Sequence, residues 1–150
     1  MKILAIDPGV KTGVAQYNTD FPHLPYLEIV EGGLQGFQSW WEKNIDSGFI
    51  SYDKLVVEDF TNREGVHGVD WTPLEIIHWL QATEQIDALQ QPSFRKPGDM
   101  LSDKALKRAN LYPRRGTVGD KHQVEALRHA LAYLIAQRHI PTIALISPRG

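Results

Sequence analysis

Residues 3–17 read ILAIDPGVKTGVAQY, and this stretch decides the fold. Its first part, Ile3 to Ile6, is a short apolar run that is stopped by the turn signal Asp7-Pro8-Gly9. A second strand candidate then runs from Val10 to Tyr17. Two short strands around a glycine-rich turn predict a β-hairpin.

Strand and helix patterns alternate after this hairpin. We expect further strands at 26–30 and 55–57, and helices at 34–45, 72–89, 102–110 and from 120 to just before Pro141. Thr72, Pro73 and Glu75 are expected to start the second helix as cap, first helical residue and capping-box partner. A very short strand can form at Ser93-Phe94, and residues 142–146 stay unassigned. The pattern predicts an α/β fold with a single domain over residues 1–150.

The composition is that of an ordinary globular domain. The chain has 150 residues, of which 23% are charged, and no cysteine. The absence of cysteine excludes disulfides, thiolate metal sites and cysteine nucleophiles. No apolar run reaches the ~18–20 residues of a membrane span, and the run before Asp7 is too short for a signal peptide. We therefore expect a cytoplasmic protein.

Two predicted strands end in carboxylates. Asp7 follows the first apolar strand, and Glu58 follows the apolar run at 55–57. Open α/β sheets bind ligands at such strand ends, and two like charges at short range are unfavourable unless a cation lies between them. Oxygen ligands of this kind favour magnesium or manganese. The alternatives are a turn aspartate and two solvated loop acids. Asp59 is set aside, because neighbours on a strand face opposite ways.

The start of the last long helix is a third candidate. His122, Glu125 and His129 are three and four residues apart, so they share one helix face. Glu125 lies in the most apolar part of this helix, where a buried carboxylate needs a partner. Asp120 is explained equally well as a simple helix cap, and His129 as an ordinary half-buried histidine.

Together, these stretches resemble the motifs of the RuvC-type Holliday junction resolvases, in the family's order and spread over most of the chain. The motifs are ILAIDPG at 3–9 with TGVA at 12–15, LVVE at 55–58 and HQVEAL at 122–127. The continuation RHAL at 128–131 is similar to the short phage-type members in particular. The resemblance implies a ribonuclease H-like mixed sheet, in which antiparallel hairpin strands and parallel strands are flanked by helices.

The resemblance also implies an activity, namely magnesium-dependent nicking of two strands of a four-way DNA junction by a homodimer. Such an enzyme would serve DNA recombination or repair in a bacterial or phage-infected cytoplasm. Asp7 and Glu58 match the first two acids of the family's site. Glu125 stands where the family usually has aspartate, and His122 where many members have aspartate and some have histidine.

These matches assign roles in a two-metal site. Asp7 is expected to bridge two Mg²⁺ ions, with Glu58 on one ion and Glu125 and His122 on the other. Mn²⁺ could replace Mg²⁺. Asp120 is the substitute for His122, which we rank first because it shares the helix face of Glu125.

Positive charge is concentrated in residues 95–128. This segment has nine basic and four acidic residues, whereas the rest of the chain carries a net charge of −7. Clusters of Arg and Lys bind phosphates, so we expect DNA contacts here; the alternative is a solvated charged surface. The candidate DNA-binding residues are Arg95, Lys96, Lys104, Lys107, Arg108, Arg114, Arg115 and Lys121. Arg128 belongs to the same segment.

Other functions stay open from the sequence. A nuclease of this fold could act on other branched DNA or on RNA, and a catalytically silent module could bind junctions without cutting them. Similar hairpins cradle phosphates in actin-like nucleotide-binding proteins, although 150 residues are few for their two-lobed core.

Overall fold

A five-stranded mixed sheet forms the centre of the molecule. The computed structural model describes residues 1–60, 69–91, 100–113 and 121–147. The strands are β1 (Lys2–Asp7), β2 (Lys11–Asn18), β3 (Tyr26–Glu31), β4 (Lys54–Glu58) and β5 (Ala88–Gln90). Their order is β3-β2-β1-β4-β5; the first three are antiparallel neighbours, and the β1–β4 and β4–β5 pairs are parallel. The predicted hairpin and mixed sheet are confirmed.

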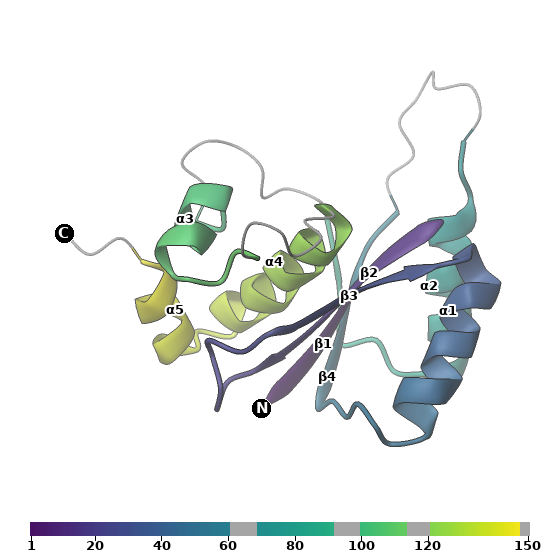
Figure 1. Ribbon diagram of the computed structural model, residues 1–150, viewed down its shortest axis with the longest axis horizontal. Helices are drawn as coiled ribbons and strands as arrows, with labels where there is room; N and C mark the ends of the chain where they lie inside the picture. Colours follow the sequence, from purple (N-terminus) through teal and green to yellow (C-terminus); the bar gives the residue numbers. More distant parts are fainter. Residues whose placement is uncertain (61–68, 92–99, 114–120, 148–150) are drawn as a thin grey trace.

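Helices cover both faces of this sheet (Figure 1). On one face lie α1 (Gly33–Trp41), its π-helical continuation η1 (Glu42–Asp46) and α2 (Thr72–Thr83). On the other face lie α3 (Asp103–Arg108), α4 (Lys121–Ala136) and α5 (Ile140–Ile146). This is a ribonuclease H-like α/β arrangement. No helix within the described ranges has both the length and the apolar character needed to cross a membrane.

β1 joins two hydrophobic cores, because its side chains alternate between the faces of the sheet. Ile3 and Ala5 pack against α4, whereas Leu4 and Ile6 pack in the core beneath α1 and α2. All four side chains are fully buried. A strand covered on both faces is apolar along its buried length, and among the buried residues of β1 only the last, Asp7, has an ionisable side chain.

The core beneath α1 and α2 holds the tryptophans that follow a helical period. The ring centroids of Trp41 and Trp79 lie 5.9 Å apart, and those of Phe37 and Trp41 lie 5.8 Å apart. Trp40 belongs to the same core. These aromatic residues stabilise the domain by filling its interior.

α4 is enclosed on all sides from its third residue to residue 131. Residues 123–131 are all buried. Val124 and Leu127 share a core with Ala5 on β1, with Leu106 on α3 and with Ile146 on α5. A helix covered in this way must pair its polar side chains locally, because a buried polar group without a partner is costly.

The second predicted helix is shorter than its sequence pattern. The expected helix over 72–89 ends at Thr83, and Glu84 takes an extended backbone conformation. Residues 88–90 instead form β5 on the edge of β4. Asp87 fixes this change of direction, because its N–H donates to the Leu55 carbonyl and its carboxylate accepts from the Leu55 N–H, both at 2.8 Å. Strand pairing thus overrides the local helical pattern.

Two helix starts test the capping predictions. The helix expected over 102–110 does start at this point, and Ser102 caps α3, since its hydroxyl accepts from the Ala105 N–H at 3.3 Å. The predicted Thr72 cap of α2 is wrong: Trp71 holds the cap position, and its carbonyl accepts from the Glu75 N–H at 3.0 Å.

The sequence pattern does not predict the last helix. Residues 142–146 belong to α5, and burial of Ile146 in the core explains why this short helix docks. The strand considered at Ser93-Phe94 lies outside the described residues.

Candidate active site

Two carboxylates end neighbouring parallel strands at one edge of the sheet. Ile6 pairs with Val57 in the β1–β4 register, so Asp7 and Glu58 follow at the same level. Asp7 is 6% exposed. Asp59 has other partners, since its carboxylate accepts from the Phe60 N–H at 2.8 Å and from Nε2 of Gln91 at 3.1 Å. The structure therefore brings together the two acids selected from the sequence.

The environment of Asp7 disfavours its charged form. Burial raises the pKa of the Asp7 carboxyl to about 8. The hydrogen bond with His122 lowers this pKa, while the hydrogen bond and the charge of Glu58 raise it. A divalent cation relieves such a pair of carboxyl groups, because its charge stabilises both anionic forms.

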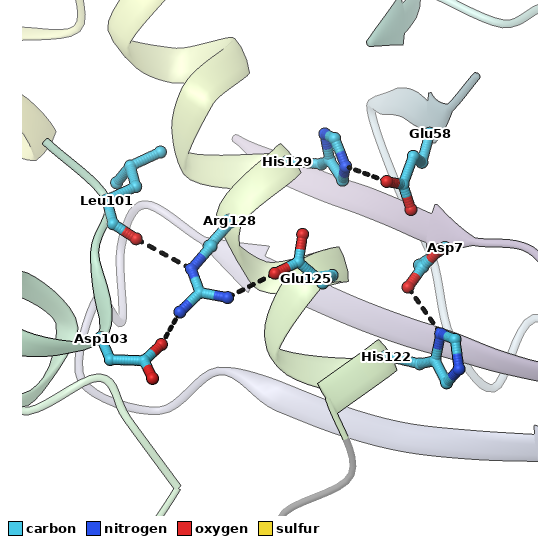
Figure 2. Close-up of polar contacts among 8 residues, drawn as sticks. All are labelled: Asp7, Glu58, Leu101, Asp103, His122, Glu125, Arg128 and His129. Atoms are coloured by element: carbon cyan, nitrogen blue, oxygen red, sulfur yellow. Dashed lines mark hydrogen bonds and ion pairs between the residues drawn. The ribbon is translucent and has the colours of Figure 1, made fainter. Parts of the chain in front are cut away.

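A close approach between β2 and α4 places His122 over Asp7. Gly13 pairs with Asp7 across the hairpin. A Cβ atom at Gly13 would collide with the backbone carbonyl of His122, so only glycine lets the helix start here. The Nδ1 atom of His122 then lies 2.8 Å from Oδ2 of Asp7 (Figure 2). The hairpin sequence and the first turn of α4 thus build this contact together.

Glu125 is held by a buried arginine. Its side chain is 3% exposed and forms an ion pair with Nη1 of Arg128, one turn further along α4. Arg128 also donates through Nε to the Leu101 carbonyl at 2.8 Å and contacts the Asp103 carboxylate through Nη2 (Figure 2). The expected need of Glu125 for a partner is confirmed. Arg128, which the sequence grouped with the phosphate-binding segment, is a buried structural cation instead.

His129 faces Glu58 from the next turn of α4. It is fully buried rather than half-buried. Its Nδ1 lies 2.8 Å from Oε1 of Gln90 on β5, and its Nε2 lies 3.6 Å from Oε1 of Glu58. Figure 2 shows the ring directed at the Glu58 carboxylate. Ligand atoms of Glu58, Glu125 and His129 all lie within 4.8 Å of one another.

These groups fit a divalent cation. The carboxylates of Asp7, Glu58 and Glu125 supply oxygen ligands, and the histidines supply nitrogen. The expected sharing of one ion by His122 and Glu125 stays a prediction. In the structure His122 contacts Asp7, whereas Glu125 clusters with Glu58. Asp120, which the sequence offers as a substitute for His122, lies outside the described residues.

The basic candidates divide into three groups. Lys104 and Lys121 are exposed and line a hollow of about 370 Å³ between α3 and the start of α4, which Glu125 also lines. Lys107 lies 4.8 Å from the ring centroid of Tyr112, and Arg108 donates to the Ile146 carbonyl at 3.0 Å. The remaining candidates, Arg95, Lys96, Arg114 and Arg115, lie outside the described residues.

Three contributors to the site were missed in the sequence. The role of Gln90 is not apparent from the sequence, because the predicted helix extends to residue 89 and conceals strand β5. Leu101 acts through its backbone carbonyl, which carries no sequence signal. Asp103 is 25 residues away from Arg128 in the chain, so no local pattern indicates their contact.

The sheet order β3-β2-β1-β4-β5, with helices on both faces, is that of a ribonuclease H-like fold, and acids stand at the ends of β1 and β4 and on α4. Solved structures of junction resolvases share this fold. The chain matches Thermus thermophilus RuvC in complex with a Holliday junction substrate with a TM-score of 0.59 and 14% identity, over 93% of this chain and 97% of that chain. A second structure of Thermus thermophilus RuvC gives a TM-score of 0.59 at 15% identity, over 93% and 96% of the two chains.

A viral resolvase extends this comparison. Fowlpox virus resolvase, in complex with substrate Holliday junction DNA, matches with a TM-score of 0.55 and 12% identity, over 91% of this chain and 99% of that chain. No protein-family model and no curated protein sequence matches the chain. The chain therefore has the RuvC-like resolvase fold that the sequence motifs implied.

Proposed function

We propose that the chain is a divalent-metal-dependent endodeoxyribonuclease that resolves four-way DNA junctions. The observation that carries this proposal is the convergence of Asp7, Glu58 and Glu125 at one edge of a RuvC-like fold. Buried carboxylates at this density are unfavourable without a cation. Two of the structures that share the fold are complexes with Holliday junction DNA, which supports a branched DNA substrate.

The site residues have distinct roles in this proposal. When bound, two Mg²⁺ or Mn²⁺ ions supply an activated water and neutralise charge on the leaving oxygen. Asp7 would hold these ions together with Glu58, because Asp7 is hydrogen-bonded to both His122 and Glu58. Glu58 and Glu125 would supply the other carboxylate ligands. His122 orients the Asp7 carboxylate through its hydrogen bond, and it would add an imidazole ligand at the open edge of the site, where its side chain is 45% exposed.

The DNA backbone is proposed to reach this edge across the hollow next to α4. Lys104 and Lys121 line the hollow together with Glu125, so a bound phosphate there lies beside the site. Each neutralised phosphate releases counterions, which makes binding depend on salt. Symmetric nicking requires one site for each of two strands, and we therefore propose a homodimer.

A cleavage assay on a panel of DNAs tests this function. Four-way junctions, Y-forms, flaps and an RNA duplex are incubated with the protein in Mg²⁺, beside the Asp7→Asn variant. We expect cleavage of the four-way junction, and loss of cleavage with retained binding in Asp7→Asn. Asp59→Asn is the matched control, because this neighbouring carboxylate faces away from the cluster and should retain activity. Full cleavage by Asp7→Asn refutes the site, and a preference for another nucleic acid refutes the substrate.

A further inference from the structure

We propose that Nε2 of His129 is a direct ligand of a divalent cation held between Glu58 and Glu125. This inference rests on the proposed function and deepens it, because it adds a nitrogen ligand that neither the fold nor the sequence motifs assign. It starts from position: Glu125 and His129 are one turn apart on α4 and meet Glu58 at the end of β4.

The protonation of the ring follows from Gln90. The amide oxygen of Gln90 lies 2.8 Å from Nδ1 of His129 and can only accept a hydrogen bond, so Nδ1 carries the proton. In neutral imidazole the other nitrogen then has its lone pair available for a metal. Hydrogen bonding through the second nitrogen is the common way in which proteins orient a metal-binding histidine.

The distance to Glu58 agrees with a shared cation. Nε2 of His129 lies 3.6 Å from Oε1 of Glu58, which is too long for a hydrogen bond. Two ligands that each lie ~2.0–2.2 Å from one ion are separated by a distance of this order. Full burial of His129 also fixes the ring, so the nitrogen is presented without a change of rotamer.

The chemistry of the ligand predicts the metal preference. Mg²⁺ favours oxygen ligands, whereas imidazole nitrogen favours transition metals. A position formed by two carboxylates and one imidazole should therefore bind Mn²⁺ more tightly than Mg²⁺. The alternative reading of the same contact is an imidazolium of His129 that pairs with the Glu58 carboxylate and binds no metal.

Electron paramagnetic resonance of bound Mn²⁺ separates these two readings. The measurement uses the His122→Asn protein, so that the second proposed imidazole ligand does not contribute. Labelling histidine with ¹⁵N distinguishes an imidazole ligand from other nitrogens. We expect nitrogen coupling to Mn²⁺ that changes with the label and disappears in the double variant His122→Asn/His129→Gln.

Two further measurements keep the test independent of folding defects. Gln90→Leu retains His129 but removes the group that orients it, and should weaken Mn²⁺ binding by about 10-fold or more in calorimetric titrations. Mg²⁺ binding should change less. Lys43→Ala, on the opposite helical layer, is the control and should leave both affinities unchanged.

The outcomes also separate this inference from the proposed function. If Mn²⁺ binds and junctions are cut, but nitrogen coupling is absent or survives loss of His129, the inference is wrong and the nuclease proposal stands. If the wild-type protein does not bind Mn²⁺, the inference is wrong, and if it binds neither Mn²⁺ nor Mg²⁺, the nuclease proposal is wrong as well.

Discussion

The ion pair between Arg128 and Glu125 makes a quantitative prediction about stability. Replacing Arg128 by methionine removes the positive charge that is paired with the carboxylate of Glu125. Glu125 as a whole residue is only 2% exposed. Breaking a buried ion pair by removing one partner costs about 3–5 kcal/mol. In a domain of this size, 1 kcal/mol lowers Tm by about 2–4 °C. The expected fall in the Tm of Arg128→Met is therefore roughly 6–20 °C.

The second carboxylate that contacts Arg128, that of Asp103, provides the control. The Asp103 side chain is 58% exposed, so water and salt screen its contact with the same guanidinium. Asp103→Asn should cost less than about 1 kcal/mol. The double variant Arg128→Met/Glu125→Gln leaves no charge of this pair in the interior and should regain part of the lost stability.

Thermal and urea unfolding without metal, followed by fluorescence of the four tryptophans, measure these differences in Tm and in the free energy of unfolding. The reasoning is refuted if Arg128→Met loses no more stability than Asp103→Asn. If the double variant recovers nothing, the loss reflects the packing of the long arginine side chain rather than an unbalanced charge.

Three further predictions concern pH, the α4 contact and DNA binding. Since the pKa of Asp7 is raised from 3.8 to about 8, the folded chain holds a proton that the unfolded chain releases, and the metal-free protein should lose stability as pH rises between these values. Asp7→Asn should flatten that slope in urea titrations, and an unchanged slope contradicts burial as its cause. Gly13→Ala places a Cβ against the first turn of α4 and should cost about 1–3 kcal/mol by thermal unfolding; wild-type stability would contradict the close approach. Lys104→Ala and Lys121→Ala should each reduce the salt slope of junction binding by ~1, unlike Lys43→Ala, and equal slopes in all three variants would contradict the proposed DNA path.

The hairpin and the acids at strand ends could be predicted because their signals are local. The apolar run before Asp7, the turn after it and the run before Glu58 each stop where a strand stops. The carboxyl ends of neighbouring parallel strands lie at the same edge of a sheet, so the approach of Asp7 and Glu58 followed from topology alone. The i to i+3 and i to i+4 spacing on α4 likewise placed Glu125 and His129 on one face.

Contacts between distant segments could not be predicted in this way. The end of α2 depends on hydrogen bonds between Asp87 and Leu55, which no helical period reveals. The burial of Arg128 depends on α3 packing over α4, so its charge suggested DNA while its surroundings make it a partner for Glu125. Counting charges along the sequence cannot distinguish an arginine that binds DNA from one that pairs with a buried carboxylate.

Because α4 is buried, the site residues that it carries can rearrange only through the slowest motion of the molecule, which is unfolding. The helix that carries Glu125, Arg128 and His129 is buried over nine consecutive residues, 123–131. Backbone amides in such a segment exchange with solvent only when the whole domain unfolds. Glu125 and His129 therefore hold their arrangement for as long as the protein stays folded, and substitutions that loosen this helix will reduce stability and activity together.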